Sequence, residues 1–161
     1  MISSIISLMK NNTGSRDVRN ALEEIYGRIN AVGEMYDLLN ISESYANVNV
    51  AAYLNRIIDG IPRVHDGIQI HTEFESFYLK VNSAVLIGLI ITELITNSIK
   101  YAFPNDTSGS IAVQVQRQEA TIIVVVSDNG IGIPDDYKSG SGISLGMRLV
   151  EALTTQLQGT L

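Results

Sequence analysis

Four polar residues, Glu93, Asn97, Lys100 and Tyr101, recur at helical spacing in an otherwise apolar stretch of the chain. With about 3.6 residues per turn, they fall on one stripe of a helix. A buried carboxylate is costly unless it is paired, so this stripe is expected to face a cleft or a partner. A structural alternative stays open, in which Glu93 simply pairs with Lys100.

The helix that must position these residues is predicted to be buried, because the run from Ala84 to Ile91 is apolar almost all round. Asn82 or Ser83 is predicted as its N-cap and Pro104 as its stop. The side opposite the polar stripe is expected to carry apolar residues, namely Ile87, Ile91, Leu94, Ile95 and Ala102.

A second polar segment, Asp128 to Gly132, directly follows the β-branched run Thr121–Ser127, which predicts a central strand. A carboxylate at a strand end can accept a hydrogen bond from an exocyclic amine. The glycines Gly130 and Gly132 let the backbone approach a flat ring. A tight turn is the alternative, since Asp-Asn-Gly favours turns.

A third segment is rich in glycine, at Gly140, Gly142 and Gly146, and opens into a predicted helix from Leu145 to Gln158. Free backbone N–H groups and the positive end of a helix dipole favour an anion at such a junction. The spacing matches neither a Walker A loop nor the dinucleotide fingerprint. A flexible loop would explain this segment when it is taken alone.

In this order the three segments resemble the N, G1 and G2 boxes of the ATP-binding domain shared by histidine kinases, Hsp90 chaperones, MutL and DNA gyrase. Within that superfamily the chain resembles the dimerisation and ATP-binding region of sensor histidine kinases that have a two-helix dimerisation domain. Residues 93–103 fit that subgroup's N box, Glu-Leu-x-x-Asn-(Ser/Ala)-x-Lys-(Tyr/His)-Ala-Phe, and residues 36–39 fit its linker. A related subgroup fits less well, because Thr92 replaces its N-box histidine.

The resemblance implies two ligands, ATP and Mg²⁺, and a role for each matching residue. Glu93 would polarise the attacking nucleophile, and Asn97 would bind Mg²⁺ that bridges the phosphates. The remaining roles implied are a phosphate contact by Lys100, a pocket wall from Tyr101, an adenine contact by Asp128, an adenine pocket shaped by Gly130 and Gly132, and a lid and phosphate-side turn from Gly140, Gly142 and Gly146.

Two domains are predicted, in an α+β fold. Residues 1–44 form an antiparallel helical hairpin, whose apolar residues at 4-3 spacing indicate a homodimer through residues 1–40. Packing of that hairpin on the rest of the chain is the alternative. Residues 45–161 form a two-layer α/β sandwich with a mixed sheet and helices on one face, the Bergerat-type ATP-binding fold of the family.

The periodicity of residues 45–161 also predicts the individual elements. These are a strand at Val48–Val50, a helix at Ala51–Asp59 ended by Gly60, strands at Ile68–Phe74 and Ile111–Gln116, a hairpin loop at Gln118–Ala120, a final helix ended by Gly159, and the start of a strand at Thr160. His71 is expected to be solvated on its strand, and His65 to lie in a turn.

Composition narrows the function classes. The net charge of −6 without a dense basic block argues against a nucleic-acid partner, and the absence of cysteine excludes disulfides. No apolar run before the polar stripe is long enough to span a bilayer. A cytoplasmic location is expected, alone or as the cytoplasmic part of a larger sensor.

The implied function is ATP-dependent phosphorylation of a histidine, followed by transfer to an aspartate on the receiver domain of a response regulator. Members of the family carry the acceptor histidine near the start of the first dimerisation helix, and here no histidine precedes His65. The chain is therefore expected to be a fragment or a truncated relative that does not autophosphorylate. The alternative is an ATP-dependent switch that phosphorylates nothing.

Overall fold

The computed structural model describes residues 18, 22, 47–61, 67–104, 107–132 and 145–161. The predicted helical hairpin of residues 1–44 lies outside this set, apart from Val18 and Leu22, which are both helical. The homodimer and the domain boundary at residue 44 therefore stay predictions.

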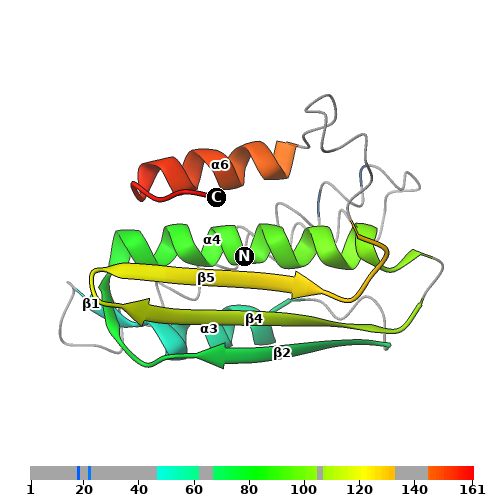
Figure 1. The fold of residues 1–161 in the computed structure, drawn as a ribbon, viewed down its shortest axis with the longest axis horizontal. Coiled ribbons are helices and arrows are strands. Elements are labelled where there is room, and N and C mark those ends of the chain that lie inside the picture. The colour runs from blue at the N-terminus through cyan, green and yellow to red at the C-terminus, as the bar shows by residue number, and fades with distance from the viewer. Residues whose placement is uncertain (1–17, 19–21, 23–46, 62–66, 105–106, 133–144) are drawn as a thin grey trace.

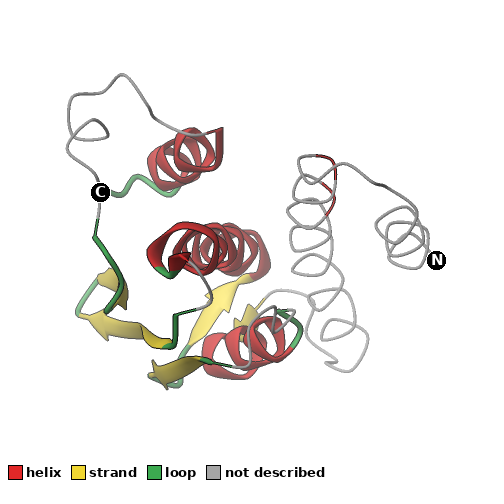
Figure 2. Cartoon of the chain, turned by 90° about the vertical axis from the view of Figure 1, so that its right-hand side faces the viewer, coloured by secondary structure: helices red, strands yellow, loops and turns green. Residues whose placement is uncertain are grey.

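A mixed sheet of three strands forms one layer, in the order β2, β4, β5. Strand β2 (Ile68–Phe74) pairs in parallel with β4 (Gly109–Gln118), and β4 pairs antiparallel with β5 (Thr121–Asp128). Figures 1 and 2 show α3 (Val50–Asp59) and α4 (Val81–Asn97) covering one face of this sheet. The predicted α/β sandwich with a mixed sheet and helices on one face is confirmed.

The core lies between the sheet and the helices α3 and α4. Ile111, Val113 and Val115 alternate along β4 and are buried, whereas Gln114 and Gln116 between them are exposed. They meet the predicted inner side of α3, formed by Tyr53, Leu54, Ile57 and the half-buried Ile58. Fully burying an aliphatic side chain of this size contributes about 1.5–3 kcal/mol.

Gly88 lets α3 and α4 approach closely. A Cβ at this position would lie 2.6 Å from Cδ1 of Ile57 and 2.7 Å from Oη of Tyr53. The side chains of Ile57 and Tyr53 would have to shift within the packed core to admit a Cβ, so packing rather than backbone conformation favours glycine here.

A second, two-stranded sheet leads into the two helices. Strand β1 (Asn47–Asn49) pairs antiparallel with β3 (Tyr78–Lys80), a strand that the sequence did not predict. Asn49 ends β1 and caps α3, because its Oδ1 accepts a hydrogen bond from the N–H of Ala52 at 2.9 Å. The strand predicted at Val48–Val50 is therefore displaced by one residue.

The predicted N-cap of α4 was wrong. The helix starts at Val81, and the cap position is Lys80, whose side chain makes no capping hydrogen bond. Asn82 and Ser83 lie inside the first turn. The chain runs directly from β3 into the helix, so the pairing of β3 with β1 decides where the helix begins.

Strand β5 was predicted as central, but in the described sheet it lies at an edge, and β4 is the central strand. Ile122, Val124 and Val126 pack on the core, whereas Val125 between them is 42% exposed. The continuous β-branched run therefore marks a strand correctly but does not specify its neighbours. The hairpin loop before β5 is also shorter than predicted, because Gln118 pairs with Thr121.

The last helix, α6 (Leu145–Gln156), packs on α4 rather than on the sheet. It ends two residues earlier than predicted, and Gln158 rather than Gly159 takes the left-handed conformation (φ 58°). The N–H of Gly159 then donates to the carbonyl of Thr154 at 2.9 Å, which closes the helix. Thr160 and Leu161 form no strand.

Two other expectations concern single features. His71 is exposed on β2, as predicted, and His65 lies outside the described residues.

Among the described helices, the segment Val81–Ala102 is long and apolar enough to cross a membrane, but half of its apolar window is buried inside the fold. A core helix passes the same test of length and composition.

Candidate active site

Glu93 and Asn97 lie on α4 beneath the first turn of α6. Glu93 is buried, with 3% of its surface exposed. A Cβ on Gly146 would lie 2.7 Å from Oε2 of Glu93 and 3.7 Å from the side-chain amide of Asn97. Three of the residues singled out in the sequence are therefore neighbours, and Gly146 belongs to the helix itself rather than to the loop before it.

The polar stripe of α4 is not opposed by a single apolar side, because α4 is covered both by the sheet and by α6. Leu94, predicted to face away from Glu93, packs on the cluster that joins α4 to α6. Ile91 and Ile95 pack on the sheet side, as predicted. A helix covered on two sides needs apolar residues on both, and periodicity alone cannot assign each residue to its partner.

Beyond Asn97 the helix widens into a π-helical turn, η1 (Ser98–Ala102). The hydroxyl of Ser98 donates to Oδ2 of Asp128 at 2.8 Å, and the backbone N–H of Gly130 donates to Oδ1 of the same carboxylate at 3.1 Å. Each oxygen of Asp128 thus has one donor among the described residues. A role for Ser98 was not predicted from the sequence. The only feature that could have indicated one is that a small polar residue lies beside Asn97 in an apolar helix.

The turn after β5 is held at several points. The N–H of Ile131 donates to the carbonyl of Ala102 at 3.0 Å, and Asn129 exchanges two hydrogen bonds with the backbone of Ser110, at 2.8 and 3.2 Å. A Cβ on Gly130 would lie far inside van der Waals contact with Ala102. The segment therefore forms a held bend that leaves the Asp128 side chain exposed, and such a bend is compatible with both interpretations of this segment.

Gly132, in the same turn, adopts φ +77°, a left-handed conformation that glycine reaches without strain. Within the described part of the chain, no other residue lies near the position of a Cβ there. Its requirement is conformational, whereas that of Gly130 is the close approach of Ala102.

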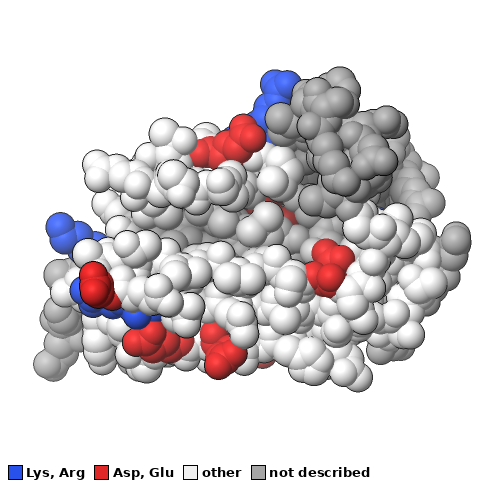
Figure 3. All heavy atoms as spheres, viewed as in Figure 1, with Lys and Arg blue, Asp and Glu red and all other residues white. Residues whose placement is uncertain are grey.

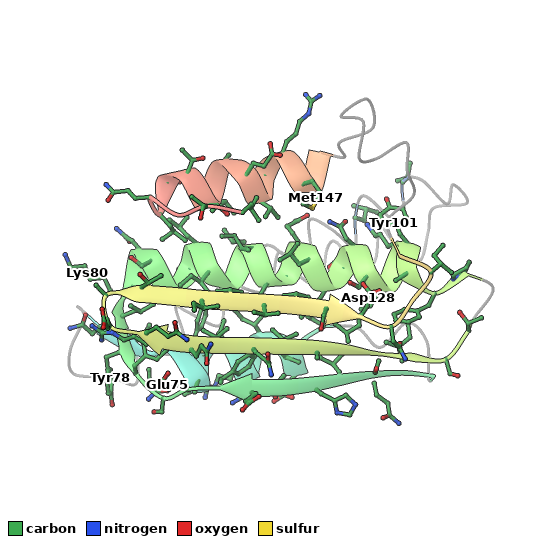
Figure 4. All side chains as sticks on the ribbon, in the orientation of Figure 1. Glu75, Tyr78, Lys80, Tyr101, Asp128 and Met147 are labelled. Carbon is green, nitrogen blue, oxygen red and sulfur yellow. The ribbon has the colours of Figure 1, made fainter. Side chains whose placement is uncertain are left out.

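Lys100 and Tyr101 both lie on the π-helical turn. Lys100 is half-buried and Tyr101 is 62% exposed. Figure 4 shows Tyr101, Asp128 and Met147 toward one end of the molecule, with Tyr78 and Lys80 toward the other. The end that carries Tyr101 therefore brings together the C-terminal turn of α4, the turn after β5 and the first turn of α6.

The surface between these elements is hollowed. Figure 3 shows a furrow between the layer of α6 and that of the strands, on a face with few Lys or Arg side chains. A polyanion bound here would depend on backbone N–H groups and a metal ion for compensating charge. Gly140 and Gly142, predicted to supply such N–H groups, lie outside the described residues.

The donor set fits a loosely held magnesium ion. Among the described residues, no three His, Cys, Asp or Glu side chains are grouped to hold a metal. Mg²⁺ is commonly bound by one or two protein oxygens while phosphate oxygens and waters complete its shell. The neighbouring amide of Asn97 and carboxylate of Glu93 suit that mode and not a closed protein cage.

Two family models match this chain. Residues 82–161 match the family model described as histidine kinase-, DNA gyrase B- and HSP90-like ATPase, and residues 1–65 match the family model described as histidine kinase. The sensor histidine kinase PdtaS of Mycobacterium tuberculosis is 28% identical over 165 residues, which cover 99% of this chain and 33% of that protein. The chain thus spans about a third of that relative.

Two further proteins are similar to this chain. The histidine kinase domain of the blue-light-activated kinase EL346 from Erythrobacter litoralis superposes with a TM-score of 0.76 at 22% identity, covering 97% of this chain and 84% of that one. An anti-sigma F factor of Bacillus licheniformis is 24% identical over 106 residues, which cover 66% of this chain and 59% of that protein. The two family models together span most of the length of the chain. The chain therefore belongs to the sensor histidine kinase family.

Proposed function

We propose that this chain is the ATP-binding catalytic region of a two-component sensor kinase, which transfers the γ-phosphate of ATP to a histidine and thence to a response regulator aspartate. The observation that carries the proposal is the exposed Asp128 carboxylate, which Ser98 and Gly130 orient at one end of a site. Glu93, Asn97 and Gly146 are neighbours at the other end.

Adenine recognition would take place at Asp128. Its carboxylate accepts a hydrogen bond from the exocyclic amine of adenine, while Gly130 and Gly132 allow the ring to lie against the backbone. Tyr101, which is exposed on the π-helical turn, lines the same pocket.

The phosphates would extend toward Asn97 and the first turn of α6. Asn97 would hold Mg²⁺, which when bound would neutralise charge on the phosphate oxygens. Lys100 would contact a phosphate, and Gly140, Gly142 and Gly146 would supply backbone N–H groups to the phosphate chain. Asn97→Asp is expected to disturb metal-dependent nucleotide binding more than metal-free binding.

Transfer requires an in-line approach of the acceptor. The imidazole nitrogen forms a bond to the γ-phosphorus while the bond from that phosphorus to the bridging oxygen of ADP breaks. Glu93 accepts a hydrogen bond from the other ring N–H, which raises the nucleophilicity of the attacking nitrogen. ADP leaves with the electron pair of the broken bond.

The acceptor histidine would not come from this chain. No histidine precedes His65, and the exposed His71 lies on β2, within the ATP-binding region itself. We expect labelled ATP to phosphorylate a version extended upstream to include the acceptor, and not the 161-residue chain. An acid-labile phosphohistidine on the 161-residue chain would contradict this assignment.

Asp128→Asn is the test of the nucleotide site. An amide presents its NH₂ group to the adenine amine, so two donors face each other and ADP binding is abolished or strongly weakened. Calorimetric titration of the variant should show this loss. Affinity equal to that of the unmodified chain would remove Asp128 from the site.

Assembly as a homodimer through residues 1–40 is part of the same proposal, with the receiver domain of a response regulator as the further partner and a cytoplasmic setting. Residues 1–65 match the histidine kinase family model. Removal of residues 1–44 should convert the dimer to a monomer in light scattering. An unchanged number of subunits after removal would contradict the proposed interface.

A regulator that binds nucleotide without phosphorylating anything is the second candidate. One observation favours it: the similarity to a protein named as an anti-sigma factor. Under this alternative the chain binds ATP, but an upstream-extended version transfers no phosphate to histidine. The same labelled-ATP experiment therefore separates the two candidates.

A further inference from the structure

Ser98 is a buried polar residue to which the resemblance gave no role. Only 9% of its surface is exposed, and its hydroxyl donates to Oδ2 of Asp128, thirty positions further along the chain, at 2.8 Å. This bond joins the π-helical turn that follows α4 to the end of β5. It therefore ties two of the three predicted segments together directly.

The two donors on Asp128 fix the plane of its carboxylate. Ser98 holds Oδ2, and the N–H of Gly130 holds Oδ1 at 3.1 Å. Each carboxylate oxygen can accept a second hydrogen bond, so both retain capacity toward a ligand. With Ser98 removed, one backbone donor remains, and the exposed carboxylate gains freedom to rotate about its terminal torsion.

That rotation matters for the choice of base. The 6-amino group of adenine is a donor that a fixed acceptor recognises, whereas the 6-oxo group of hypoxanthine or guanine would face the carboxylate as a second acceptor. A carboxylate free to turn can instead accept the N1–H that 6-oxo purines carry. Restricting the rotation thus rejects these bases as well as favouring adenine.

We infer that Ser98 is a positioning residue that sets the preference of this site for 6-aminopurine over 6-oxopurine nucleotides. The inference deepens the proposed function and rests on it. Ser98 acts through Asp128, since the hydroxyl is committed as a donor to that carboxylate. Its contribution is selectivity as well as affinity.

The test is calorimetric titration of the chain with ADP and with inosine diphosphate, both with Mg²⁺. Ser98→Ala should lower the ratio of ADP to inosine diphosphate affinity by about tenfold, the usual scale for a lost hydrogen bond to a charged group. Ser98→Cys leaves no cavity, because the thiol is slightly larger than the hydroxyl, but it donates weakly, so it should lower the ratio in the same direction. Thermal melting of both variants checks that the fold is retained.

Thr92→Val is the matched control. Thr92 is buried on the same helix, and its hydroxyl donates to the carbonyl of Gly88 at 2.8 Å instead of to the site. The substitution removes a buried hydroxyl at nearly constant volume and should leave the affinity ratio unchanged.

The outcomes separate the two levels of the proposal. If both affinities fall equally in the Ser98 variants, or neither changes, the role assigned to Ser98 is overturned while the nucleotide site stands. A larger fall in the affinity for ADP than in the affinity for inosine diphosphate supports this role. If the unmodified chain binds no ADP, the proposed function itself fails, whatever Ser98 does.

Discussion

The two ends of the proposed nucleotide site are built by different kinds of interaction. At the Asp128 end, the hydrogen bonds from Ser98 to Asp128 and from Ile131 to Ala102 tie the turn after β5 to the π-helical turn. The bond from Gly130 to Asp128 lies within the turn, and Asn129 ties the turn to β4. At the Glu93 end, the first turn of α6 lies over α4, and α6 is held mainly by apolar packing around Ile90. The first end is part of the sheet, and the second depends on one helix staying docked.

Because of this difference, we expect that a substitution can disrupt one end of the site and leave the other end intact. A single hydrogen bond contributes about 0.5–1.5 kcal/mol, so the Asp128 end gains its rigidity from several bonds acting on one short turn. The α6 contact relies on few buried side chains, each contributing about 1.5–3 kcal/mol. Damage to α6 should therefore loosen the Glu93 end and leave base recognition in place.

Gly130→Ala should have the largest effect, at the Asp128 end. The new Cβ would overlap the carbonyl group of Ala102, which is backbone and cannot rotate away, so the whole turn must shift. We expect ADP affinity to fall by at least about 30-fold as the Asp128 contact is lost. Calorimetric titration measures this directly.

Ile131→Ala is the control in that turn. Its side chain is exposed, and its backbone bond to Ala102 is unaffected by the change. Stability equal to that of the unmodified chain is expected. A Gly130→Ala variant that binds ADP normally would show that the turn is not rigid, and the contrast between the two ends would fail.

Val150→Ala should come next, at the α6 contact. Val150 is fully buried between α4 and α6, and its truncation should cost about 2 kcal/mol. Hydrogen exchange should show faster opening of α6 while the amides of β4 keep their protection. Thr155→Ala, on the exposed side of α6, should leave both rates nearly unchanged.

Gly146→Ala sharpens the contrast because it touches the catalytic end alone. The new Cβ would lie 2.7 Å from Oε2 of Glu93, so the flexible carboxylate must move. Phosphotransfer in the upstream-extended version should fall by about tenfold, and ADP affinity should fall less.

Glu93→Asp, whose side chain is shorter, tests whether Gly146→Ala acts through the clash with Glu93. In the double variant, the clash with the new Cβ at Gly146 is relieved, so the two effects should be less than additive. Fully additive losses would mean that Gly146 acts through something other than Glu93.

Gln158→Gly should have the smallest effect, and a stabilising one. Gln158 holds φ 58°, which costs a residue with a side chain about 1 kcal/mol and glycine little. Denaturant unfolding should show a gain of about 0.5–1 kcal/mol. A loss of stability would show that the Gln158 side chain contributes more than its backbone conformation costs.

The sequence predicted features that depend on local pattern. Alternation gave the inward residues of β4, and the apolar side of α3 followed from its period, because both record which face meets the core. Glu93, Asn97 and Gly146 were singled out from their residue types, and they are neighbours. Binding roles for these residues stay proposals.

The features that the sequence did not predict depend on long-range pairing. Strand β3 has only three residues and exists because β1 pairs with it, and this pairing also moved the start of α4 to Val81. The bond from Ser98 to Asp128 joins positions that no local pattern connects. The edge position of β5 likewise depends on which strands are its neighbours.

The parallel pairing of β2 with β4 has a consequence for how the molecule folds. Parallel neighbours cannot be joined by a tight hairpin, and here the chain between them contains β3, α4 and the π-helical turn. Closing this long connection is a slow, non-local event, so the sheet cannot be completed until the crossover helix has docked. Glu93 and Asn97 lie on that helix, and Ser98 lies on the π-helical turn that follows it. We therefore expect these three residues to reach their native positions in the same cooperative step that closes the core.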